Sequence, residues 1–129
     1  MKKLLLITMF VALFSACTDP TNPPEHNISA SDYKGTWHVQ ENCSKNAYTV
    51  NITIDSGDSS VVYISNFGQL GNDFNAKANV DNELITVLKQ SIDGTEVSGN
   101  GTLSNEKITW SFSINDGTDL TECTAVYTK

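Results

Sequence analysis

The chain of 129 residues is long enough for one domain, and its 15 acidic residues against eight lysines give a formal net charge of −7. It contains no arginine, so the guanidinium fork that pairs with phosphates and guanine bases is missing. The charge and the missing fork argue against nucleic acid as a partner and against electrostatic attachment to an anionic membrane.

The first residues have the order of an export signal. Lys2 and Lys3 precede an apolar run, and small residues stand immediately before Cys17. This order is typical of a secretory signal peptide, and the run is too short to span a bilayer as a helix. It resembles a bacterial lipoprotein signal, which implies removal of residues 1–16, a lipid anchor of the palmitate type on Cys17 and a place in the outer membrane of the cell envelope. The alternative is an ordinary secreted protein in which Cys17 is lost or merely structural.

A tether is expected between the anchor and the domain. All three prolines of the chain lie within residues 17–32. Pro-rich linkers are extended and semi-rigid, so this segment would hold the domain away from the membrane. The folded domain is then expected at residues 33–129.

From residue 33 onward the pattern indicates an all-β domain. Short runs rich in Val, Ile, Thr and aromatic residues alternate with turn residues such as Asp-Gly and Gly-Asn. Strands are predicted at residues 35–42, 46–54, 60–66, 74–80, 84–90, 95–103, 107–114 and 120–128. Within them apolar residues recur with period two, as expected when one face of the sheet is buried. In the strand 74–80 this pattern predicts that Phe74 lies on the buried face. Eight short strands predict a small eight-stranded antiparallel up-and-down barrel, and a two-sheet β-sandwich is the alternative. No helix is predicted outside the signal peptide.

The three cysteines constrain the closure of this barrel. An odd cysteine in an exported protein needs an explanation, and if Cys17 carries lipid, Cys43 and Cys123 remain as a pair. With these two opposite each other in antiparallel first and last strands, Glu41 faces Ala125, and Val39 faces Tyr127 on the buried side. A disulfide would staple the closing seam, and two buried free thiols are the alternative.

No catalytic or metal-binding constellation is found, so neither an enzyme nor a cofactor is predicted. His38 is the only histidine of the folded part and by parity points to solvent, which leaves no Ser/His/Asp or Cys/His arrangement. The oxygen-rich segments 55–58 and 115–119 match no complete calcium loop and are interpreted as turns. The glycines of residues 98–101 indicate a sharply bent strand rather than a phosphate cradle.

Four aromatic residues are the candidates for lining a ligand cavity: Trp37, Tyr48, Trp110 and Phe112. They could equally fill the centre of a small barrel. Strands of seven or eight residues make a shallow vessel, which favours a mostly filled core.

The opening Gly35-Thr36-Trp37 resembles the Gly-X-Trp start of lipocalin-like domains, in which the Trp closes one end of the barrel. With the run 98–103 and the Cys-containing residues 122–125, the pattern resembles small lipoproteins of Bacteroidetes-type bacteria over about residues 33–129. This resemblance implies a fold and an envelope location rather than a reaction.

The leading functional hypothesis is therefore a lipid-anchored, non-catalytic binding protein for a small apolar ligand, a glycan or a protein. The alternative is an inhibitor of an envelope-directed lysozyme or protease. A binding protein predicts a ligand-sized interior cavity, whereas an inhibitor predicts a protruding apolar loop, for which residues 67–74 are the candidate.

Overall fold

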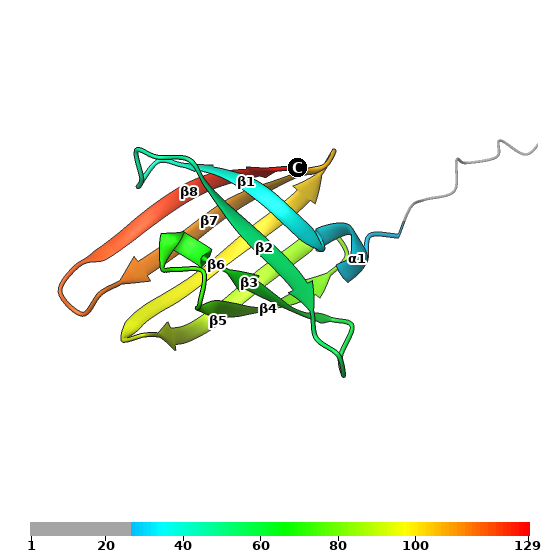
Figure 1. Cartoon of the computed structure of the whole chain (residues 1–129), viewed down its shortest axis with the longest axis horizontal. Coiled ribbons are helices and arrows are strands. Elements are labelled where there is room, and N and C mark those ends of the chain that lie inside the picture. Colours follow the sequence, from blue (N-terminus) through cyan, green and yellow to red (C-terminus); the bar gives the residue numbers. More distant parts are fainter. Residues whose placement is uncertain (1–26) are drawn as a thin grey trace, which may run out of the picture.

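The computed structural model describes residues 27–129, so the predicted signal peptide, Cys17 and most of the predicted tether lie outside the described residues. Within this range eight strands and two short helical segments follow one another (Figure 1). In chain order they are α1 (Ala30–Tyr33), β1 (Gly35–Glu41), β2 (Tyr48–Ile54), β3 (Val61–Ser65), the 3₁₀ turn η1 (Phe67–Gln69), β4 (Asn75–Asp81), β5 (Leu84–Ile92), β6 (Thr95–Ser104), β7 (Lys107–Asn115) and β8 (Leu120–Thr128).

The strands form a closed antiparallel up-and-down barrel of the lipocalin-like kind. Each strand pairs with its neighbour in sequence, and β8 pairs back onto β1. The closing seam has the predicted register, with Val39 opposite Tyr127 and Glu41 opposite Ala125. Because the sheet closes on itself, the two-sheet sandwich is excluded and no strand is left at an open edge.

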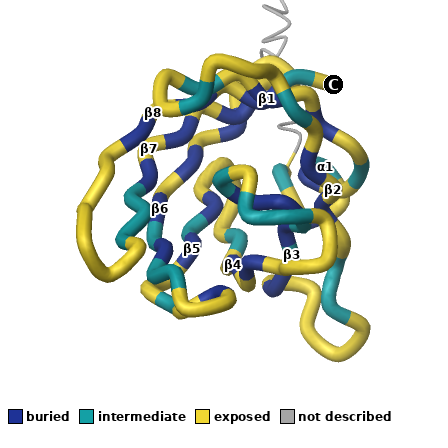
Figure 2. The backbone as a smooth tube through the Cα atoms, turned by 60° about the vertical axis from the view of Figure 1, so that its left-hand side comes forward, coloured by how far each residue is buried: buried dark blue, intermediate teal, exposed yellow. Residues whose placement is uncertain are grey.

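The barrel core follows from the alternation of residues along each strand. Figure 2 shows buried and exposed positions alternating along β6 and β7, as a sheet with one wet face requires. Residues 98–101 lie within the continuous strand β6, and the close approach of neighbouring side chains expected at its glycines is found at Gly101. A Cβ atom there would lie 2.8 Å from Ile85 Cγ2 and 2.9 Å from Trp110 Cδ2, so only glycine leaves room for these side chains. The pairing of β5 with β6 has a register shift between Val87 and Gln90, an irregularity of the kind that bends a strand locally.

One end of the barrel is covered by α1. Tyr33 and Trp37 are fully buried there, and the Tyr33 hydroxyl donates to Asn82 O at 2.9 Å in the β4–β5 turn. The Trp37 indole donates to Tyr33 O at 2.7 Å, and Lys129 Nζ lies 4.7 Å from the centre of the Trp37 ring. Trp37 therefore closes this end, as its resemblance to the lipocalin-like opening implied.

The segment α1 corrects two expectations from the sequence. It is a helix where none was predicted, and its core residue Ala30 lies within the predicted tether, so the folded part begins before residue 33. The helix is a single turn held by Ser29, whose backbone N–H donates to the carboxylate of Asp32 at 2.8 Å. A single capped turn is too short to show the periodicity that identifies a helix in a sequence. Within residues 27–129 no helix has the length and apolar character needed to cross a bilayer.

The opposite end is closed by η1, the green coil in Figure 1. Phe67 is 1 % exposed and points into the barrel, although it comes from a loop rather than a strand. Phe74, which was predicted to share the buried face of its strand, is 37 % exposed. The correction has a local cause, because Phe74 precedes β4 and its backbone N–H donates to Gly71 O at 3.2 Å in the same loop. Phe67 therefore occupies the interior, and Phe74 faces outward.

The disulfide between Cys43 and Cys123 confirms the predicted pairing. It lies just beyond the paired part of β1 and β8, where Asn42 and Thr124 continue the contact through two hydrogen bonds of 3.1 and 2.8 Å. Cys123 is buried, and Cys43 is exposed in the β1–β2 loop. The bridge thus fastens the seam at the end of the barrel that η1 closes.

Candidate functional site

The best candidate site is the barrel interior behind Phe67. The ring centre of Phe67 lies 5.4 Å from that of Trp110 and 5.2 Å from that of Phe112, both on β7. The Trp110 ring in turn lies 5.5 Å from Tyr127 on β8. Gly68 permits this approach, because a Cβ atom there would meet Ile114 Cδ1 at 2.7 Å. Four aromatic rings, one from a loop and three from two strands, thus form one cluster inside the barrel.

Two polar atoms in this aromatic cluster have no hydrogen-bond partner among the described residues: Trp110 Nε1 and the Tyr127 hydroxyl. Tyr127 is fully buried and Trp110 is 1 % exposed. Burial raises the pKa of Tyr127, and the charge of Glu41 raises it further, so the hydroxyl keeps its proton and remains a donor. The interior therefore presents two hydrogen-bond donors, and no acceptor in the described chain pairs with either of them.

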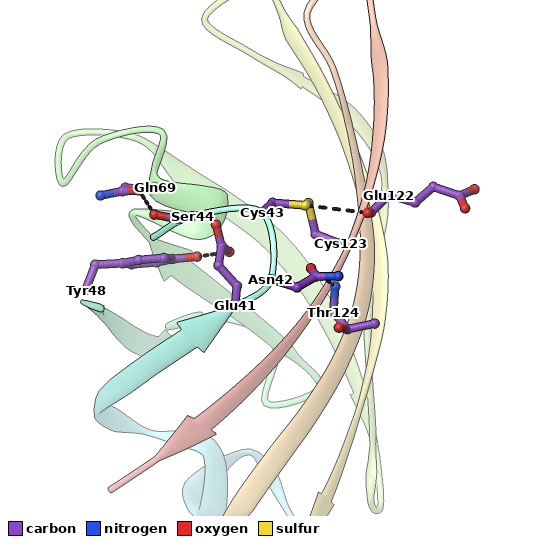
Figure 3. The surroundings of a disulfide bond; sticks show 9 residues. All are labelled: Glu41, Asn42, Cys43, Ser44, Tyr48, Gln69, Glu122, Cys123 and Thr124. Carbon is purple, nitrogen blue, oxygen red and sulfur yellow. Dashed lines mark hydrogen bonds between the residues drawn. A yellow bond between two sulfur atoms is a disulfide. The ribbon is translucent and has the colours of Figure 1, made fainter. Parts of the chain in front are cut away.

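Polar side chains lie near the disulfide, at the end of the barrel that η1 closes, here called the mouth (Figure 3). Glu41 shares the inward parity of Val39, and its carboxylate accepts a hydrogen bond from the Tyr48 hydroxyl. Burial, followed by this hydrogen bond, raises the pKa of Tyr48. Beside this pair, Ser44 Oγ donates to Gln69 Oε1 at 2.9 Å and so joins the β1–β2 loop to η1. The disulfide-fastened loop thus contacts the segment that carries Phe67.

The backbone of the Phe67 loop adopts an unusual conformation. Asn66, Gly68 and Gln69 have φ values of 59°, 61° and 61°, in the left-handed region. For a residue other than glycine this region costs about 1 kcal/mol or more. Asn66 supports the turn, since its side-chain amide donates to Thr49 O at 3.0 Å and its side-chain oxygen accepts from Gly71 N at 2.9 Å. The loop therefore depends on a few hydrogen bonds and on the burial of Phe67.

The four aromatic candidates from the sequence all face inward, but they do not form one site. Trp110 and Phe112 lie together against Phe67, and Tyr48 lies at the mouth. Trp37 belongs to the opposite end, under α1. Tyr127 and Glu41 were predicted to lie in the seam, but neither was assigned to a site. The fixed register of β1 and β8 was the signal that could have found them.

A second candidate is a groove on the outer face of β5 to β8, with a volume of about 410 Å³. Five of its lining residues carry a hydroxyl or amide, among them Thr86, Asn100 and Ser111, and two more, Lys89 and Glu122, are charged. Leu88, which is 60 % exposed, forms an apolar wall. The small polar groups suit a hydroxyl-rich ligand, and the two charges of opposite sign favour neither an anion nor a cation.

The acidic turns act as backbone caps rather than as a catalytic or metal site. Asp55 accepts a hydrogen bond from the Tyr63 hydroxyl and two from the backbone N–H groups of Gly57 and Asp58, and together these lower its pKa. Asp116 likewise accepts from two backbone N–H groups of its own turn. Among residues 27–129 no group of three or more His, Cys, Asp or Glu side chains could hold a metal ion.

No protein-family model, curated protein or solved structure matches this chain. The fold and the interior define its class as a closed eight-stranded barrel with a loop-borne aromatic plug at one end. This class is therefore defined by the geometry of the described residues alone.

Proposed function

We propose that the chain is a lipid-anchored, non-catalytic binding protein of the bacterial envelope. Its ligand site is the barrel interior behind Phe67, and the ligand is a small, mainly apolar molecule. The anchor is Cys17, as the lipoprotein-like signal implies, and the tether holds the barrel away from the membrane. In the closed barrel aromatic side chains fill this interior, so the ligand-sized cavity that a binding protein predicts would form only when Phe67 leaves.

One observation carries the proposal: a residue of a loop, not of a strand, fills the centre of the aromatic cluster. Strand-borne side chains such as Trp110 cannot leave the interior without breaking the sheet. Phe67 can leave when only residues 66–74 move, because the strands on both sides of this loop stay paired with other strands. Movement of the loop would create an apolar space lined by Trp110, Phe112 and Tyr127.

The cost of opening determines how tightly a ligand would bind. Removing a buried Phe side chain into water costs about 3 kcal/mol, which corresponds to an open fraction below about 1 %. The apparent affinity is then about 100-fold lower than that of the open barrel. A ligand that fills the vacated space replaces the lost apolar contacts, so binding is possible in spite of this cost.

The experiment is calorimetric titration of the full-length chain with α-methylstyrene, a small apolar probe. We expect saturable binding of one molecule per chain, tightened by up to about 100-fold in Phe67→Ala because opening no longer costs the burial of the ring. Phe67→Leu should change the affinity in the same direction by less. Phe74→Ala is the matched control, since this exposed phenylalanine of the same loop should leave the affinity unchanged.

Absence of saturable binding to both the wild type and the Phe67 variants would rule out the interior site. An equal effect of Phe67→Ala and Phe74→Ala would also contradict it. In that case the loop would act on binding through its general conformation and not through the Phe67 ring.

A second candidate ligand is a neutral glycan in the outer groove, favoured by the hydroxyl and amide lining around Asn100. A binding screen with neutral oligosaccharides tests it. Asn100→Ala should weaken such binding, whereas Asn51→Ala on the outer face of β2 should not.

The inhibitor alternative loses the loop on which it depended. Residues 67–74 were the candidate for a protruding apolar loop, but Phe67 is buried in the barrel. Of the large apolar residues in this segment, Phe74 is exposed and Leu70 is half-buried against the core. An inhibitory role would have to use another loop, and we do not propose one.

A further inference from the structure

We infer that the interior site selects an uncharged ligand with a hydrogen-bond acceptor, such as a carbonyl or ether oxygen, through Trp110 Nε1 and the Tyr127 hydroxyl. This inference rests on the proposed interior site and adds the chemical class of its ligand. It assigns a specificity role to two residues that otherwise serve only as core.

Two buried hydrogen-bond donors of the aromatic cluster lack an acceptor among the described residues. Trp110 and Tyr127 are both buried, and neither polar atom has a partner among residues 27–129. A buried donor without a partner is costly, and the great majority of buried polar side-chain atoms are paired. Other buried donors of this barrel follow that rule: the Trp37 indole donates to Tyr33 O, and the Tyr33 hydroxyl donates to Asn82 O. The two unpaired donors instead belong to the aromatic cluster behind Phe67.

Their position connects them to the space that Phe67 occupies. The Trp110 ring packs against both Phe67 and Tyr127, and its centre lies 5.4 Å and 5.5 Å from theirs. A molecule that takes the place of the Phe67 ring would therefore lie against the Trp110 ring, which in turn packs against Tyr127. One acceptor atom on such a molecule would pair with a donor that no residue of the described chain satisfies.

Charge restricts the ligand further. An anion would have to lose its hydration inside an apolar cluster and lie near the Glu41 carboxylate at the mouth. A cation would likewise have to lose its hydration inside this apolar cluster. An uncharged acceptor avoids both penalties, so the site favours a small ketone, ether or similar molecule over an ion.

The test compares two probes of nearly the same shape. Acetophenone carries a carbonyl group where α-methylstyrene carries a CH₂ group, so the ratio of their affinities reports the hydrogen bond. Calorimetric titration is repeated on Tyr127→Phe and Trp110→Phe in the full-length chain. Tyr33→Phe is the control, because its hydroxyl is paired at the far end of the barrel.

We expect Tyr127→Phe or Trp110→Phe to reduce the preference for acetophenone by about threefold to tenfold, the effect of one lost hydrogen bond. Tyr33→Phe should leave the preference unchanged. If both probes bind and none of the variants alters their ratio, the inferred specificity is wrong while the proposed interior site stands. If neither probe binds the wild type or Phe67→Ala, both the inference and the proposed site are wrong.

Discussion

The unpaired hydroxyl of Tyr127 makes a prediction about stability that does not depend on any ligand. In the closed barrel this hydroxyl is fully buried and has no partner among the described residues. An unsatisfied buried polar group costs about 1–3 kcal/mol, and the small cavity left after its removal offsets part of that gain. We therefore expect Tyr127→Phe to stabilise the protein by about 1 kcal/mol, or by roughly 4–8 °C in the unfolding midpoint.

Thermal unfolding followed by circular dichroism measures this change. Tyr33→Phe is the matched control, because it removes the same atom but breaks a hydrogen bond to Asn82 O of 2.9 Å. That variant should be destabilised by about 0.5–1.5 kcal/mol. If Tyr127→Phe loses as much stability as Tyr33→Phe, the Tyr127 hydroxyl has a partner in solution and the reasoning about the interior donors fails.

Four further predictions concern the anchor, the seam, the core and the buried phenol. Cys17→Ala should release the protein from membranes, as cell fractionation would show. Cys43→Ser should lower the unfolding midpoint under oxidising conditions, because the chain-entropy model assigns about 4.5 kcal/mol to a bridge across a separation of 80 residues. Gly101→Ala should destabilise the barrel by about 1–3 kcal/mol through overpacking, measured by urea denaturation, with Gly57→Ala as the unstrained control. Above about pH 10 the unfolded chain loses phenolic protons that folded Tyr127 keeps, so stability should fall by about 1.4 kcal/mol per pH unit for this residue.

Each of these predictions has a result that contradicts it. Unchanged membrane retention of Cys17→Ala argues against lipidation, and an unaltered midpoint of Cys43→Ser argues that the bridge adds nothing to stability. Equal effects of Gly101→Ala and Gly57→Ala would show that the core around Trp110 adjusts to an added methyl group. An alkaline slope that Tyr127→Phe leaves unchanged would mean that this phenol titrates as freely in the folded state as in the unfolded one.

Much of the fold could be predicted because local patterns specify it. Period-two alternation, as along Ile108, Trp110 and Phe112, identifies the inward face, and turn residues such as Asp93-Gly94 mark the ends of strands. The register of the seam followed from one further assumption, the pairing of Cys43 with Cys123. The short segments α1 and η1 escaped prediction because each is about one turn long and depends on contacts with the barrel.

The candidate site was harder to predict than the strands that form it. Trp110 and Phe112 were identified as interior aromatics. Phe67 was considered only as part of the protruding loop that the inhibitor alternative requires. In sequence, Phe67 and Phe74 are both loop-flanking phenylalanines with similar surroundings. Only the left-handed turn at Asn66, supported by its contacts with Thr49 and Gly71, directs the first of them into the barrel.

The sequence by itself thus determined the strands and their inward faces, because these depend on residue spacing along the chain, whereas the structure decided between a closed barrel and a two-sheet sandwich. The tertiary structure alone decided which loop fills the interior and which polar atoms are left without partners. Both depend on distances between residues far apart in the chain, such as Phe67 and Trp110, which come into contact only after the sheet has closed.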